Sequence, residues 1–228
     1  AWHDEWGYRR FGFHGLSVEW STGRAGELLG RDPRELGLVV AHLGAGCSVT
    51  AVWRGRSAAT SMGMTPLEGL VMATRSGSVD PGILLAAQRE HGLDATALTE
   101  ILDRRSGLLG ISGTSGDVRE LLVAAPRDER AALAIAVFVR SAAAGIAAAA
   151  TALPRLDAIV FTGGIGEHAA TVRASIVGRL ASIGVPAVSS EPVTEDAILA
   201  RRPVAVLRSE AREDVVIARA VRRVVPEH

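Results

Sequence analysis

The most constraining stretch of the sequence is residues 157–168, where an apolar segment, three glycines and a helical pattern follow one another. Residues 157–162 (DAIVFT) are largely apolar and β-branched, residues 163–166 are Gly-Gly-Ile-Gly, and helical spacing begins at Ala169. This order predicts a buried strand, a tight glycine turn and the start of a helix. Glycine lets backbone N–H groups approach an anion without a Cβ in the way, and a helix amino terminus carries about half a positive charge. The stretch therefore favours a phosphate-bearing ligand, with an ordinary strand-to-helix connection as an alternative of about equal weight.

The basic residues exclude two classes of phosphate chemistry. All 25 of them are arginine, because the chain contains no lysine. A Walker phosphate loop and pyridoxal phosphate chemistry both need a lysine, so neither class fits this chain acting alone. Phosphate charge would have to be met by arginine, backbone N–H groups and a metal ion. The formal net charge is zero and no basic tract occurs, which argues against nucleic acid or an anionic membrane surface as the main partner.

Length, hydropathy and cysteine content further limit the class of protein that this chain can be. A chain of 228 residues can form one large or two small domains with a substantial core. The longest apolar run, residues 131–153, is interrupted by Arg140, so neither a membrane span nor a signal peptide is predicted. Cys47 is the single cysteine, which excludes a disulfide framework and a cysteine metal site within the chain. A reducing, cytoplasmic setting fits these features.

The hydrophobic pattern predicts one α/β domain, in which strands of mixed spacing are followed by strand–helix alternation. Gly55 is expected to make a tight hairpin, and residues 62–81 and 106–113 are expected to be irregular. The predicted strands are residues 38–43, 48–54, 56–61, 157–162 and 203–207, and the predicted helices are residues 17–29, 82–91, 95–105, 117–124, 127–152, 169–183 and 213–223.

Four side chains could carry chemistry, and each also has an ordinary structural explanation. His14 lies in an Arg/Phe/Gly setting, where a structural or exposed histidine is the common case. Arg75, in an irregular loop, could clamp a transferring phosphoryl group through its fork of donors, or it could be a surface arginine. Asp117 and Glu213 each open a predicted helix. A carboxylate there caps the helix, but Asp117 could also bind ribose or adenine and Glu213 could bind a metal.

The glycines of residues 44–46 permit a dinucleotide-binding interpretation. Gly44 and Gly46 follow a predicted strand, as in that fingerprint. However, the next predicted element is another strand, and the acid expected about 20 residues further on is missing, the closest being Glu68. A Rossmann-type oxidoreductase is therefore a weak alternative.

Seven segments, taken in order, point to one family. They are residues 10–15 (RFGFHG), 42–48 (HLGAGCS), 60–70 (TSMGMTPLEGL), 74–81 (TRSGSVDP), 106–113 (SGLLGISG), 117–119 (DVR) and 161–167 (FTGGIGE). In this order they resemble the acetate kinase family, which belongs to the acetate and sugar kinase, heat-shock ATPase and actin superfamily. The resemblance covers most of the chain from residue 8 onward.

The resemblance implies an actin-like, ribonuclease H-like fold of two domains, each a β-β-β-α-β-α-β-α unit, with nucleotide in the cleft between them. The chain is similar to the second domain. Residues 1–30 are therefore interpreted as a lead-in from the domain junction, and residues 31–228 as the carboxyl-terminal nucleotide-binding domain. The family's first domain, with its own phosphate loop and a substrate arginine, is expected to be missing. A homodimer is also implied by the resemblance.

The reaction that the resemblance implies is reversible phosphoryl transfer between ATP and acetate, which gives ADP and acetyl phosphate and uses Mg²⁺. Propionate or another short acid is left open as acceptor. The roles carried over by position are phosphoryl stabilisation by His14 and Arg75, an acetate pocket lined by Phe13, a phosphate loop of His42, Gly44 and Gly46, an adenosine site of Asp117, Val118, Arg119, Gly164 and Ile165 with His168 beside it, and Mg²⁺ binding by Glu213, through water.

The sequence departs from the family pattern at a few positions. Ala45 replaces an asparagine between the two glycines of the phosphate loop, so one phosphate donor is lost. Ala59 and His168 replace an aspartate and an asparagine, and Leu16-Ser17-Val18 replaces Thr-Ser-His. Two hypotheses follow: the nucleotide-binding part of an acetate kinase, active only when completed by a first domain, or a non-catalytic remnant that binds nucleotide or dimerises. The isolated chain is expected to turn over acetate at background rate.

Overall fold

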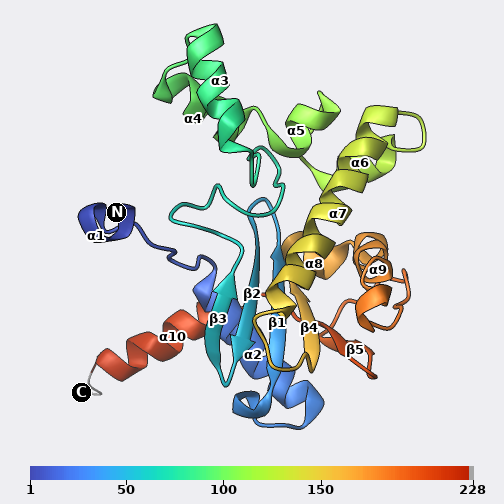
Figure 1. Ribbon diagram of the computed structural model, residues 1–228. Coiled ribbons are helices and arrows are strands. Elements are labelled where there is room, and N and C mark those ends of the chain that lie inside the picture. Colours follow the sequence, from blue (N-terminus) through green and yellow to red (C-terminus); the bar gives the residue numbers. More distant parts are fainter. Residues whose placement is uncertain (226–228) are drawn as a thin grey trace.

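A six-stranded mixed sheet forms the centre of the computed structural model, which describes residues 1–225 (Figure 1). The strand order is β3-β2-β1-β4-β6-β5. Strands β1, β2 and β3 form an antiparallel meander, β4 and β6 run parallel to β1, and β5 is antiparallel to β6. The bounds are Gly37–Leu43 (β1), Cys47–Trp53 (β2), Arg56–Thr60 (β3), Ala158–Thr162 (β4), Ala197–Ala200 (β5) and Ala205–Arg208 (β6).

The five predicted strands are confirmed to within two residues at each end. The hairpin at Gly55 is also confirmed: Arg54 and Gly55 have φ values of 53° and 71°, as a tight turn between twisted strands requires. Strand β5 was not predicted. It is a four-residue, half-buried edge strand, too short to show alternation in the sequence.

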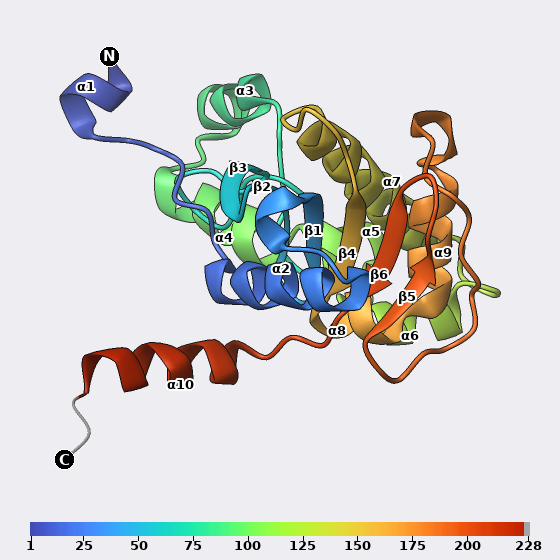
Figure 2. The ribbon, with the colours of Figure 1, turned by 90° about the horizontal axis from the view of Figure 1, so that it is seen from below.

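Both faces of the sheet are covered by helices, which explains why β1 is an almost uninterrupted apolar run. Successive side chains of a strand point to opposite faces. Val39 and Ala41 pack into the larger core cluster, with helix α7 (Glu129–Ala150). Leu38 and Val40 pack into the smaller cluster, with α2 (Gly15–Leu29). Figure 2 shows α2 and α7 on opposite sides of the sheet.

Helix α7 is the one helix of the described residues that is long and apolar enough to cross a membrane. Its buried residues, which include Phe138 and Ile146, belong to the larger core cluster. It packs against β1, β2 and three further helices, so the core accounts for its apolar character. The remaining helices are α1 (Trp2–Trp6), α3 (Pro81–His91), α4 (Ala95–Arg104), α5 (Gly107–Ser112), α6 (Val118–Ala124), α8 (Gly163–His168), α9 (Ala170–Gly178) and α10 (Glu213–Val224), with single 3-10 turns at Pro33–Glu35 and Ala181–Ile183.

Two predictions about local structure were wrong. Residues 106–113, expected to be a loop, contain α5, whose first amides are satisfied from outside the helix: Leu108 and Leu109 donate to the carbonyls of Met72 and Ala73 at 2.9 Å. The glycines of residues 163–166 do not precede a helix but form helix α8 themselves, and α9 ends at Gly178, short of the predicted residue 183. Helix α8 packs closely on β1 and β4, an approach that glycine permits.

The element order reproduces the expected β-β-β-α-β-α-β-α unit, with β5 as an addition. Several helices, α3 to α7, stand in the place of the first one. The unit places the ends of β1 and β4 side by side at one edge of the sheet, and this edge holds most of the candidate site residues.

Candidate functional site

The two glycine-bearing segments meet where β1 and β4 end. The strands are parallel and His42 is paired with Thr162, so the residues that follow each strand emerge at the same edge. The β1–β2 turn is closed by a 3.1 Å hydrogen bond from the Gly44 amide to the Gly46 carbonyl. A methyl group at Gly44 would lie 4.0 Å from the Gly164 amide nitrogen. In open α/β sheets this position, beyond the carboxyl ends of parallel strands, is where ligands bind.

Gly163 and Gly164, the first two residues of α8, are glycine for different physical reasons. Gly163 has a φ of 76°, and a Cβ there would lie 2.8 Å from the Leu43 carbonyl oxygen. It is required for the backbone of α8 to lie against β1. Gly164 has no atom within 4 Å of a Cβ position, so its missing side chain leaves open space rather than relieving a clash.

His14 is held in a strained backbone conformation beside these turns. Its φ of 59° places it in the left-handed region, which non-glycine residues seldom adopt, and it occupies the N-cap position of α2 without a side-chain capping bond. Residues in such conformations cluster at functional sites. A methyl group at Gly46 would lie 3.5 Å from His14 Nε2 and 3.6 Å from a terminal guanidinium nitrogen of Arg75. His14 and Arg75 therefore reach the same turn from two distant parts of the chain.

A second histidine stacks on the first. The rings of His14 and His42 are nearly parallel, with centroids 4.1 Å apart and an interplanar angle of 19°. Each ring is tied to a buried serine through Nδ1: His14 to Ser48 Oγ at 2.9 Å and His42 to Ser17 Oγ at 2.8 Å. The Nε2 atom of His42 lies 3.9 Å from the position of a Gly44 Cβ, so both rings turn Nε2 toward the β1–β2 turn.

Burial keeps both imidazoles neutral near pH 7. Burial lowers the pKa of His42 to about 4, and the neighbouring His14 acts in the same direction. Burial also lowers the pKa of His14; the Glu213 carboxylate opposes this shift and the Arg75 guanidinium adds to it. Burial raises the pKa of the Cys47 thiol to about 12, which removes the cysteine as a nucleophile.

Arg75 is held in place by the end of α4 and the start of α5. The segment that carries it is fixed by hydrogen bonds from Thr74 Oγ1 to the Asp103 carbonyl at 2.8 Å and from the Ser106 amide to the Thr74 carbonyl at 3.0 Å. The nearest carboxylate oxygen recorded for its guanidinium, from Asp103, is 3.8 Å away, and the side chain is 38% exposed. This leaves guanidinium donors available to an incoming anion.

The segment of residues 116–119 connects to the β1–β2 turn through Ala73. The Ala73 amide donates to the Ala45 carbonyl at 3.4 Å, and a Cβ at Gly116 would lie 2.7 Å from the Ala73 carbonyl oxygen. Asp117 caps α6 by accepting the Arg119 amide at 2.8 Å. The Arg119 guanidinium lowers the pKa of Asp117 to about 2.

The other two members of this segment differ in what they offer a ligand. The Val118 side chain is buried in the larger core cluster, so only its backbone could contact a ligand. The Arg119 side chain is 89% exposed and is paired with the Asp117 carboxylate.

The remaining candidate residues lie around this edge in different settings. Ile165 packs against the larger core cluster. His168 is the last residue of α8, with a side chain 72% exposed. Glu213 opens α10, and its charge reaches His14.

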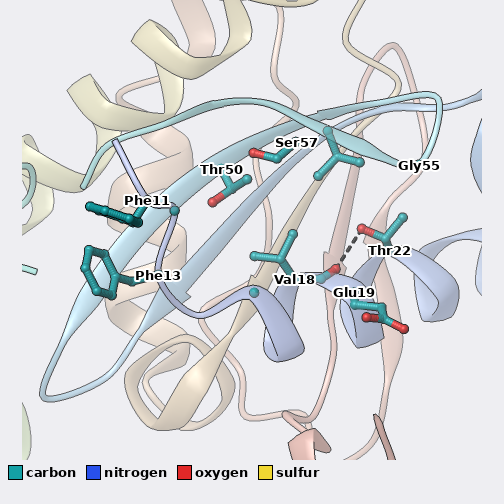
Figure 3. A pocket seen from close by; sticks show the side chains of 11 residues that line it. Phe11, Phe13, Val18, Glu19, Thr22, Thr50, Gly55 and Ser57 are labelled. Atoms are coloured by element: carbon teal, nitrogen blue, oxygen red, sulfur yellow. Dashed lines mark hydrogen bonds between the residues drawn. The ribbon is translucent and has the colours of Figure 1, made fainter. Parts of the chain in front are cut away.

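Phe13 lines a pocket of about 440 Å³ between α2 and strands β2 and β3. Figure 3 shows Phe11 and Phe13 at one end of this pocket, with Val18, Thr50 and Ser57 further along it.

The metal-binding capacity of the site is small. The described part of the chain contains no cluster of three or more His, Cys, Asp or Glu side chains that could hold a metal ion. Glu213 offers a carboxylate, the hard oxygen ligand that Mg²⁺ prefers, whereas the next residue, Asp214, is paired with Arg212 at 3.0 Å. Mg²⁺ is commonly held by one or two carboxylates together with substrate phosphates and water. The residues present fit a metal ion bound in that way.

Three buried residues of the site were not identified from the sequence. Ser17 and Ser48 were missed because they contact histidines 25 and 34 residues away. Glu167 accepts the Ala211 amide at 3.0 Å and lies 3.8 Å from the buried Arg208 guanidinium, so it fixes the segment that leads to Glu213. A polar residue inside an apolar strand was the available signal for Ser48, and a carboxylate directly after the glycines was the signal for Glu167.

Comparison with known proteins gives one consistent result. The model of the acetokinase family matches residues 1–219. The acetate kinase of Deinococcus deserti is 47% identical over 99% of this chain, and the propionate kinase of Salmonella typhimurium is 49% identical over 78% of it. The crystal structure of Porphyromonas gingivalis acetate kinase superimposes on 98% of the chain with a TM-score of 0.92 and 34% identity. The chain spans 58% of the D. deserti protein, 45% of the S. typhimurium protein and 58% of the P. gingivalis chain.

Proposed function

This chain belongs to the acetokinase family, and on that premise we propose that it is the nucleotide-binding part of a cytoplasmic acetate kinase. Such an enzyme transfers a phosphoryl group reversibly between ATP and acetate. In this proposal residues 31–228 are the carboxyl-terminal domain, residues 1–30 lead into it from the domain junction, and the protein is a homodimer. The observation that carries the proposal is the approach of His14 and Arg75 to the turn that holds Gly46.

The phosphoryl group is stabilised by donors rather than by covalent chemistry. Phosphoryl transfer asks the protein mainly for positioning and for compensation of the charge on the equatorial oxygens. Arg75 supplies charged N–H donors, and the amides of Ala45 and Gly46 together with His14 and His42 surround the same space, whereas the Gly44 amide is used to close the turn. Both rings are neutral near pH 7, so they add no charge, and each can donate a hydrogen bond from the nitrogen that carries its proton.

Adenosine lies along the edge formed by residues 116–119 and helix α8. Asp117 and Arg119 offer polar groups, Val118 offers its backbone, and Gly164 and Ile165 border the opposite side. His168 is exposed at the end of α8, within reach of the same edge. Phe13 and the pocket beside it form the apolar wall for acetate or another short acid.

Mg²⁺ would be held by Glu213 and the nucleotide phosphates, and it would neutralise charge on the phosphate oxygens. Glu213 is the first residue of α10 and follows shortly after Ala211, whose amide donates to Glu167. This hydrogen bond holds the start of α10 in place.

One observation favours a second function. Ala45 offers no side-chain donor to the phosphate turn, at a position where the family pattern has asparagine. A protein that binds nucleotide weakly and does not transfer phosphate would tolerate this loss. The two functions differ in whether the chain transfers phosphate once a first domain completes the cleft.

The test compares the 228-residue chain with the same chain joined to the amino-terminal part of the D. deserti acetate kinase. Acetyl phosphate formation is followed by trapping as the hydroxamate. We expect background turnover from the chain alone and clear activity from the joined protein. Activity at a normal rate from the chain alone would contradict the proposal that the chain is only part of the enzyme. No activity from a folded joined protein that binds ADP would contradict the kinase proposal.

Within the joined protein, Arg75→Ala should lower kcat far more than it raises KM for ATP, because a contact that strengthens in the transition state affects kcat. Arg89→Ala is the matched control, since Arg89 is 72% exposed on α3 and, within residues 1–225, its guanidinium pairs only with Glu90. A loss of ATP affinity with unchanged kcat in Arg75→Ala would rule out the assigned role.

A further inference from the structure

Two buried hydroxyl groups hold the two stacked imidazoles by the same ring atom. Ser17, on α2, and Ser48, on β2, are both fully buried. Ser48 Oγ contacts His14 Nδ1 at 2.9 Å, and Ser17 Oγ contacts His42 Nδ1 at 2.8 Å. Ser17 is close to His14 in the sequence but contacts His42, and Ser48 is close to His42 in the sequence but contacts His14.

The number of hydrogen-bond partners of each serine hydroxyl indicates whether the serine donates to the ring or accepts from it. Within residues 1–225, neither hydroxyl makes another hydrogen bond. A hydroxyl has one proton and two lone pairs. If the serine accepted from the ring, its own buried O–H would have no acceptor, and an unmade buried hydrogen bond is costly. If the serine donates, only lone pairs are left without a partner. Donation from each serine to Nδ1 is therefore favoured.

We infer that Ser17 and Ser48 are positioning residues that fix the tautomers of His42 and His14, so that each ring carries its proton on Nε2. A neutral imidazole has one N–H, and the hydrogen bond at one nitrogen sets the proton at the other. With Nδ1 accepting from serine, Nε2 becomes a donor. Both Nε2 atoms face the turn of residues 44–46, next to Arg75.

The surroundings of Nε2 agree with a donor there. Among residues 1–225 no hydrogen bond joins His14 to Arg75, so no contact with Arg75 holds the opposite tautomer. A lone pair at Nε2 would also repel a phosphate oxygen, whereas an N–H binds it. The part of the inference that concerns phosphate rests on the proposed function, whereas the tautomer assignment does not.

The tautomers are measured directly by long-range ¹H–¹⁵N correlation spectra of the uniformly labelled 228-residue chain, at a pH where the rings are neutral. The chain has 6 histidines, and His14→Gln and His42→Gln assign the two rings. We expect the Nε2–H pattern for both rings. Nδ1–H in either ring of the unaltered protein would overturn the assignment for its serine, whether or not any variant folds.

The serine variants separate positioning from general packing. Ser48→Ala should move His14 toward a mixture of tautomers and leave His42 unchanged, Ser17→Ala should do the reverse, and Ser48→Thr should restore the pattern of His14. A Ser48→Ala spectrum identical to that of the unaltered protein would contradict the inference.

Titration with inorganic phosphate and with ADP tests the link to function. We expect the Nε2–H signals of His14 and His42 to shift on binding. If the tautomers are as assigned but saturation with ADP moves neither ring, the serine assignment stands and the proposed function fails.

Discussion

The imidazole of His14, at the start of α2, lies flat on the imidazole of His42, near the end of β1, with ring centroids 4.1 Å apart. The contact joins the segment of residues 10–15 to the sheet at the edge where the glycine turns meet. Two protonated rings at this separation would repel each other in a partly buried setting. The stack therefore disfavours a state in which both rings are charged, and burial lowers the pKa of each ring.

Acid should destabilise the protein through this pair. Burial holds the pKa of His42 at about 4 in the folded protein, below its ordinary value of 6.5. Between these values the unfolded chain binds the proton and the folded chain does not, so lowering the pH favours unfolding. We expect the His42 contribution to be constant above about pH 6.5 and to decrease the free energy of unfolding by up to about 3 kcal/mol near pH 4. Urea unfolding at a series of pH values measures this change.

Two substitutions identify the source of the acid sensitivity. His42→Gln should flatten the dependence of stability on pH in this window, whereas His91→Gln, at an exposed position on α3, should not. If His42→Gln retains the full slope, the pair does not control acid stability.

The first two glycines of α8 should respond differently to alanine. Gly163→Ala forces a left-handed residue with a Cβ against the Leu43 carbonyl, so we expect a loss of about 1–3 kcal/mol in the free energy of unfolding. Gly164→Ala meets no atom within 4 Å and should leave stability nearly unchanged. It should nevertheless weaken ADP binding, by about tenfold or more, because the added methyl group occupies the space where the ligand approaches. Calorimetric titration and thermal unfolding measure the two effects.

Gly23→Ala is the control for this pair. Gly23 lies within α2 and also has no atom within 4 Å of its Cβ position, so the change should leave ADP affinity unaltered. Equal ADP affinity in Gly164→Ala and the unaltered protein would exclude α8 from the nucleotide site.

Restoring the missing donor at residue 45 should strengthen phosphate binding. Ala45 is exposed at the tip of the β1–β2 turn, so a larger side chain can be accommodated there. We expect Ala45→Asn to increase ADP affinity by about 3- to 10-fold, since one added hydrogen bond contributes about 0.5–1.5 kcal/mol. Ala45→Leu adds similar volume without a donor and should give no increase. A gain in both variants, or in neither, would contradict a phosphate contact at this position.

Asp117 should matter to the ligand more than to its helix. Asp117→Ser keeps a capping residue at the start of α6 and removes the carboxylate, so we expect stability to change by less than about 1 kcal/mol while ADP affinity falls. Asp94→Ser is the matched control, because Asp94 caps α4 in the same way and lies outside the candidate site. Equal ADP affinity in the two variants would show that Asp117 caps α6 and does not contact the ligand.

The local pattern of the sequence determined most of the secondary structure. Short apolar runs and the Gly55 hairpin located β1 to β4 and β6, an alanine-rich stretch without internal proline located α7, and Asp117 marked the start of α6. These signals arise from neighbours in the chain, where spacing alone decides which side chains share a face. The family motifs likewise supplied the residues of the candidate site, whose roles remain predictions.

Only the tertiary structure decided how these pieces meet. Helix α5 exists because the carbonyls of Met72 and Ala73 satisfy its first amides, and nothing within residues 106–113 announces this. Ser17 and Ser48 hold histidines far away in the chain, and Arg75 reaches the β1–β2 turn from a segment anchored on α4 and α5. Such contacts depend on how the helices and loops pack around the sheet, so they cannot be predicted from sequence spacing. The types of residue in the site were therefore readable from the sequence, while their distances and the proton positions that they impose are properties of the folded chain.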